Sequence, residues 1–150
     1  MPVWILESGI WDLLLLPMQH FLALDIGERR TGIAYSDEEY AVPLPLETFK
    51  HSSINELAKM VEELINERSI TTLVVGLPLL PSGEEGEQAY SVRSTLAEFR
   101  IPSTVTVELL DERYTTPRDV HTDPDASAAC TLLLTYLHRL SADTKGKEGS

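Results

Sequence analysis

Short apolar runs separated by turn residues dominate the first half of the chain, a pattern typical of β-strands. The run at 21–26 suits a central strand, and the glycine-bracketed turn GERRTG then leads into a second strand at 33–36. A third strand is expected at 41–46, where two prolines restrict it to a sheet edge or a strand terminus. Two later runs, 71–75 and 105–110, predict two more strands.

Two segments in the middle of the chain have the spacing of helices that bury one face. Ser53 and Glu56 stand at capping-box spacing, and apolar residues then recur every three or four positions as far as Ile65. A glycine- and proline-rich loop follows the strand at 71–75, and residues 88–99 predict a second helix.

A third helix is predicted near the C-terminus. Asp123 can cap it, Pro124 suits its first position, and residues 126–140 are strongly apolar, which indicates a largely buried helix. The small polar residues at 141–150 predict a frayed tail.

The first seventeen residues differ from the rest of the chain. They are apolar but interrupted by Glu7 and Asp12, they are too short to span a bilayer, and no basic residue precedes Arg29 as a secretory signal would require. We therefore expect the segment 1–17 to be an extension ahead of a start at Met18, or an appended amphipathic segment that packs on the domain or on a partner.

The predicted order is strand, strand, strand, helix, strand, helix, strand, helix. Three sequential antiparallel-type strands followed by two helix-separated strands predict an α/β fold, with a mixed sheet flanked by helices. This order is associated with ribonuclease H-like folds. We expect one such domain over 18–140, since 150 residues suffice for one domain with a real core.

Composition and charge narrow the function. The single cysteine, Cys130, excludes an internal disulfide framework and a cysteine-based zinc site, and it fits a reducing cytoplasm. The formal net charge is −12, so the chain as a whole has no electrostatic attraction for nucleic acid. A protein of this charge that acts on phosphates needs a local basic patch or bound cations.

Four acidic residues stand out by their context. Asp25 lies within an apolar strand, Asp111 and Glu112 follow the carboxyl end of another, and Asp125 opens the last helix. Carboxylates that are brought together repel one another, and magnesium, which takes oxygen ligands, removes that penalty. Two such ions about 3.5–4 Å apart could clamp the attacking and leaving oxygens of a phosphodiester.

Each of these acids also has a purely structural interpretation. Asp25 could satisfy the amides of its own turn, Asp125 could be a helix-start charge, and residues 111–113 could form a local ion-pair cluster. Since adjacent residues on a strand point to opposite faces, only one of Asp111 and Glu112 should face a shared site.

The basic residues give candidate phosphate contacts. Arg29 and Arg30 lie in the first turn, Arg93 in the second helix, and Arg113 directly after Glu112. Each could equally be a solvated surface charge. The four histidines lack metal-ligand spacing, which favours surface or structural roles: His20, His51, His121 and His138.

Four blocks of the sequence, in order, resemble the YqgF/RuvX family. They are LALDIGERRTGIAYSD at 22–37, VVGLPLLPSGEEGEQA at 74–89, LLDERYTT at 109–116 and DASAACTLLLTYL at 125–137. The family has a ribonuclease H-like fold. Its members are described as Holliday-junction resolvases and as nucleases that mature the 5′ end of pre-16S rRNA.

The resemblance implies roles for individual residues. Asp25, Glu112 and Asp125 would be catalytic ligands of Mg²⁺ (or Mn²⁺), with Asp111 as the substitute for Glu112. Arg30 and Arg113 would steady the backbone of the nucleic-acid substrate. Gly76 and Pro78 would shape a loop near the active end of the sheet.

One departure from the family concerns the segment 114–124. Many relatives carry a longer stretch here with Lys, Arg and Gly, and its loss removes basic residues that would face the substrate. The metal-site candidates are all retained.

These features favour a cytoplasmic, metal-dependent endonuclease acting on the 5′ end of pre-16S rRNA, as a monomer or homodimer, with ribosomal precursor particles as partners and no membrane. A DNA-junction resolvase is the nearest alternative, and it would need a dimer to cut two strands symmetrically. A noncatalytic module that binds ribosomal or transcription-linked partners is another. An actin-like ATP binder would need a second lobe, for which the chain is too short.

Overall fold

The computed structural model describes residues 18–39, 42–114 and 124–148; the side chains of Tyr114, Pro124, Asp125 and Glu148 lie outside the description. Within these ranges one mixed sheet has the order β3-β2-β1-β5-β6, and β4 also pairs with β2. The strands are β1 (His20–Ile26), β2 (Arg30–Asp37), β3 (Leu44–Pro45), β4 (Phe49–Lys50), β5 (Thr72–Leu77) and β6 (Thr106–Asp111).

The sheet is antiparallel on one side and parallel on the other. β1 and β2 form a hairpin in which Asp25 lies opposite Gly32. β5 runs parallel to β1 and β6 runs parallel to β5, so the carboxyl ends of these three strands meet at one edge. Residues 21–24 and 72–77 are buried because both faces of the central strands are covered.

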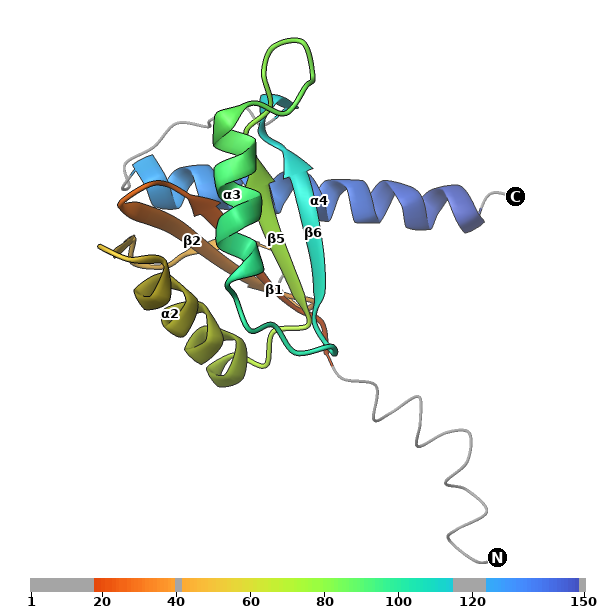
Figure 1. The fold of residues 1–150 in the computed structure, drawn as a ribbon. Helices are drawn as coiled ribbons and strands as arrows, with labels where there is room; N and C mark the ends of the chain where they lie inside the picture. Colours follow the sequence, from red (N-terminus) through yellow and green to blue (C-terminus); the bar gives the residue numbers. More distant parts are fainter. Residues whose placement is uncertain (1–17, 40–41, 115–123, 149–150) are drawn as a thin grey trace, which may run out of the picture.

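Helices cover both faces of the sheet (Figure 1). They are α2 (Ile54–Glu67), α3 (Glu87–Ala97) and α4 (Pro124–Glu148), with a 3₁₀ turn, η2 (Glu112–Tyr114), directly after β6. The predicted cap of α2 is present: Ser53 Oγ accepts from the Glu56 N–H at 3.2 Å. The Glu56 carboxylate accepts from the N–H and hydroxyl of Ser52, one residue earlier than a capping box would place it.

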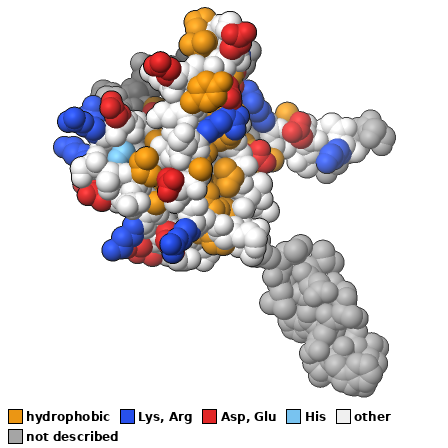
Figure 2. Space-filling view, viewed as in Figure 1, with side chains coloured by type: hydrophobic (Ala, Val, Ile, Leu, Met, Phe, Trp, Pro, Cys, Tyr) orange, Lys and Arg blue, Asp and Glu red, His pale blue; other side chains and the backbone are white. Residues whose placement is uncertain are grey.

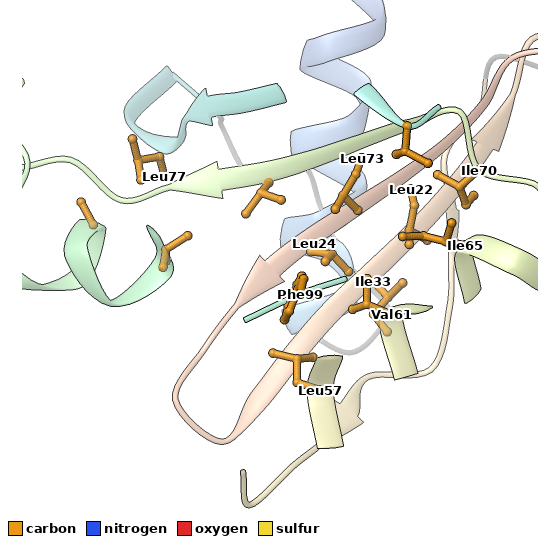
Figure 3. Close-up of a cluster of buried hydrophobic side chains, with 14 residues drawn as sticks. Leu22, Leu24, Ile33, Leu57, Val61, Ile65, Ile70, Leu73, Leu77 and Phe99 are labelled. Carbon is orange, nitrogen blue, oxygen red and sulfur yellow. The ribbon is translucent and has the colours of Figure 1, made fainter. Parts of the chain in front are cut away.

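Two hydrophobic cores result from this layering. In one, Leu22, Leu24 and Leu73 from the sheet pack against buried residues of α2 and α3 (Figure 3). These are Leu57, Val61 and Ile65 of α2, and Ala89 and Val92 of α3. The other lies under α4 and holds Phe21, Ala23, Ala34, Val74, Leu110, Ala129, Leu132 and Leu133. Alternate residues of β1 therefore serve opposite cores, as the twofold period of a strand requires.

The structure differs from the sequence-based expectations at two places. The expected third strand at 41–46 is instead two short strands, β3 and β4, since a proline within a strand cannot donate to its ladder. The expected frayed tail is helical as far as Glu148, because a helix already nucleated by its buried part extends at little cost. The segment 1–17 lies outside the described residues, and within those described no helix is long and apolar enough to cross a membrane.

Candidate active site

Two of the predicted acids lie together at the edge where the parallel strands end. Asp25 is the penultimate residue of β1, and Glu112 follows the last residue of β6. Both line a cleft of about 780 Å³. The cleft is also lined by residues at the starts of α2 and α3, including Ile54 and Gln88, and by the α2 N-cap Ser53. Topology alone thus brings two residues that are far apart in sequence to one cleft.

The strand between β1 and β6 is β5, and it has a glycine, Gly76, where the Glu112 side chain passes over it. Gly76 pairs with Leu110 and follows Val75, which is paired with Leu24. A Cβ atom at Gly76 would overlap Glu112 Oε1 and would lie 2.9 Å from its Cδ and 3.0 Å from its Cγ. The Glu112 side chain therefore lies directly over the glycine. Only the absence of a side chain at this position lets Glu112 reach across β5 toward Asp25.

The two carboxyl groups are linked by a side-chain hydrogen bond. Burial is the main reason that the pKa of Glu112 is raised to about 8; the hydrogen bond and the charge of Asp25 contribute, and the charge of Asp111 adds to them. Glu112 therefore holds its proton to a higher pH than an ordinary glutamate does. A divalent cation would replace that proton, because it removes the repulsion that keeps the proton bound.

Asp111 belongs to a different local structure. Its carboxylate accepts from Arg113 Nε at 3.0 and 3.1 Å, from Nη2 at 2.7 Å and from the backbone N–H at 3.0 Å. The hydrogen bonds from Arg113 hold the pKa of Asp111 below its usual range. Arg113 Nη1 also donates to the Pro81 carbonyl at 3.1 Å. Arg113, held by Asp111, thus ties η2 to the loop after β5, and Glu112 alone of the acidic pair lines the cleft.

The third predicted ligand, Asp125, is in the first turn of α4 by its backbone, but its side chain lies outside the described part of the structure. Ala129, one helical turn later, packs in the core that holds Phe21 and Ala23 of β1. Among the described side chains, no group of three metal-binding residues is gathered at one point. The role of Asp125 therefore stays a prediction.

The predicted basic residues fall into two groups. Arg29 and Arg30 are exposed at the β1–β2 turn and line a second hollow beside the cleft, together with Lys50 and His51. Arg93, by contrast, donates to Glu85 at 2.6 Å, so its guanidinium braces the start of α3. Sequence reasoning did not find Lys50, and it placed His51 among surface or structural residues. Nothing local signals them, since only the pairing of β4 with β2 brings them here.

The sequence profile described as "RuvX: Holliday junction resolvase" matches residues 19–139. The chain belongs to the RuvX family. Among relatives, a "Putative pre-16S rRNA nuclease" of Chloroflexus aurantiacus is 33% identical over 132 residues, which cover 79% of this chain and 86% of the relative. A protein of the same name from Desulforudis audaxviator is 39% identical over 95 residues, covering 63% and 67%.

Among solved structures, this RuvX chain is similar to RuvC of Thermus thermophilus in complex with a Holliday junction. The TM-score is 0.59 at 12% identity, over 82% of this chain and 96% of that one. Likeness at this identity concerns the fold. The predicted family and the predicted ribonuclease H-like mixed sheet are both confirmed.

Proposed function

We propose that this protein is a divalent-metal-dependent nuclease that hydrolyses phosphodiester bonds at the 5′ end of pre-16S rRNA. The observation that carries the proposal is the Asp25–Glu112 pair, two partly buried carboxyl groups in contact, an arrangement that costs stability unless they share a proton or a cation. Membership of the RuvX family and the names of the relatives support nuclease chemistry and the rRNA substrate.

The donor set fits a hard cation. The cleft is lined mainly by oxygen donors, the carboxylates of Asp25 and Glu112 among them, and His51 is the one described imidazole in its lining. Asp25, Glu112 and Asp125 would hold Mg²⁺ or Mn²⁺. When bound, such an ion activates water and stabilises the charge that develops on the phosphate oxygens.

The protein's own groups would prepare the site for that chemistry. β1 and η2 hold the two carboxyl groups in contact, so little rearrangement is needed to bind a cation. Glu112 would surrender its proton to solvent as the cation enters. Arg29 and Arg30 would bind the substrate backbone beside the cleft. Contacts from Arg93 and Arg113 to nucleic acid stay predictions, since both hold acidic partners in this structure.

The decisive experiment is cleavage of a pre-16S rRNA fragment in Mg²⁺, with Ca²⁺ as a control ion. Asp25→Asn keeps the size of the side chain but removes its charge, and we expect cleavage to fall at least about 100-fold, given the effect typical of lost catalytic groups. Asp143→Asn, an exposed position on α4, is the matched control and should cleave like the parent. If Asp25→Asn cleaves at the parental rate, the assignment of the site is wrong.

Holliday-junction resolution is the second candidate, favoured by the family description and by the RuvC-like fold. The same assay on a four-way DNA junction separates the two. A resolvase should cut the junction symmetrically and should have the mass of a dimer in solution. A monomer that cuts only the RNA supports the proposed role on ribosomal precursor particles. Binding to either substrate without cleavage would instead support a noncatalytic module.

A further inference from the structure

A second hollow, of about 540 Å³, opens beside the carboxylate cleft. Its lining residues are Arg29, Arg30, Lys50, His51, Ser52 and Glu56. His51 and Ser52 line the cleft as well, so the two spaces are neighbours that share a wall. We call this second space the basic pocket. Figure 2 shows Lys and Arg side chains beside a histidine at the left edge of the molecule, over the β1–β2 turn.

The basic pocket places positive charges opposite one another. β4 pairs antiparallel with β2 so that Lys50 lies directly across from Arg30. The His51 N–H donates to the Arg29 carbonyl at 2.9 Å, which continues the pairing by one residue. Like charges directly opposite on paired strands destabilise a sheet. An anion bound between them would relieve that cost.

Other contacts hold the wall of the pocket in place. The His51 Nε2 atom lies 3.0 Å from Oγ1 of Thr31, which is completely buried, and the ring stacks on Phe49. Among the described lining residues the one acid is Glu56, and its carboxylate accepts two hydrogen bonds from Ser52. Ser52, which precedes the N-cap of α2, thus holds the carboxylate of Glu56 by two hydrogen bonds.

We infer that the basic pocket binds a backbone phosphate of the nucleic-acid strand whose neighbouring phosphodiester lies in the carboxylate cleft, with Lys50 as a contact beside Arg29 and Arg30. The inference rests on the proposed nuclease function and specifies the path of its substrate. It also explains how a chain of net charge −12 can hold a polyanion, because the attraction is confined to one pocket.

The test measures binding apart from cleavage. A fluorescein-labelled single-stranded RNA is titrated in Ca²⁺ and followed by fluorescence anisotropy between about 50 and 200 mM KCl. Lys50→Gln removes the charge and keeps much of the side-chain length. We expect the affinity to fall about 3- to 10-fold at low salt, and the slope of log affinity against log salt to lose about 0.7, the share of one phosphate contact. Lys145→Gln, on the exposed end of α4, is the control and should match the parent.

The thermal melting temperature of Lys50→Gln tests whether the residue instead has only a structural role. We expect it to stay unchanged or rise, because Arg30 loses a like-charged neighbour. A parental salt slope, or a loss of affinity that the control shares, would overturn the inference. The cleavage assay with Asp25→Asn is independent. If that variant cleaves normally while Lys50→Gln loses RNA affinity, the catalytic assignment fails and the phosphate pocket stands. If Asp25→Asn fails to cleave while Lys50→Gln binds RNA like the parent, only the phosphate pocket is refuted.

Discussion

Replacing Glu112 by glutamine should stabilise the metal-free protein at alkaline pH. In the unfolded chain Glu112 ionises near its ordinary pKa of 4.5, whereas in the folded protein burial and the contact with Asp25 raise that pKa to about 8. The folded state thus holds the extra proton between these values, so stability falls as pH rises from about 4.5 to about 8 and stays low above it. An amide cannot ionise, and Glu112→Gln escapes this loss.

The size of the effect follows from the same pKa values. Each pKa unit corresponds to about 1.4 kcal/mol. If the site excluded water completely, the protein would therefore lose about 5 kcal/mol of stability above pH 8. The cleft is open to solvent, and screening there reduces the expected gain from Glu112→Gln to about 2 kcal/mol. For a chain of this length, that is a rise in melting temperature of about 4–8 °C.

The assay is urea unfolding of the parent and of Glu112→Gln in EDTA, at about pH 5 and about pH 9. The difference in the free energy of unfolding between the two proteins should be small at the lower pH and large at the higher pH. Asp111→Asn is the matched control with the opposite sign. Arg113 lowers the pKa of Asp111, so its charge contributes stability above its ordinary pKa of 3.8 that is lost as the pH falls, and the asparagine variant should be less stable at neutral pH. Mg²⁺ should reverse the ranking of parent and Glu112→Gln, since the cation stabilises the carboxylate by mass action. Equal stability of these two proteins at both pH values would refute the reasoning.

Two further predictions concern packing. Gly76→Ala should displace Glu112 and lower the protection that Mg²⁺ gives against unfolding, and it should cost about 1–3 kcal/mol of stability. Gly146→Ala is the control. No atom lies within 4 Å of its added Cβ, so it should be neutral or slightly stabilising. Leu133→Ala should cost about 2–5 kcal/mol because its fully buried side chain anchors α4, while Leu140→Ala, 38% exposed, should cost far less. Urea unfolding measures the stability of all four variants. A variant that loses no more stability than its control would contradict the packing described.

The elements with strong local signals could be predicted from the sequence. Ser53 and the three- and four-residue apolar spacing located α2 closely, and Pro124 begins α4 as its fixed backbone angle favours. The third strand could not be located well, because its two halves are defined by pairing with β2 rather than by their own residues. The helix beyond residue 140 has exposed polar residues, which carry no periodic signal.

The candidate site, too, could be predicted only in part from the sequence. Alternation along a strand predicted that one of Asp111 and Glu112 would face the shared site, but it could not say which. The choice is made by Arg113, which engages Asp111, and by Gly76, which leaves room for Glu112. Both depend on contacts between strands that are distant in sequence. Lys50 and His51 could not be predicted for the same reason.

The strand order has a consequence for when the protein can act during its synthesis. Asp25 is made early, yet its partner is on β6, and β5 must first insert between their two strands. Such long-range pairing is slow compared with local helix formation. A nascent chain with β6 still inside the ribosome therefore lacks the contact between Asp25 and Glu112, and the proposed active site can form only after β6 has emerged.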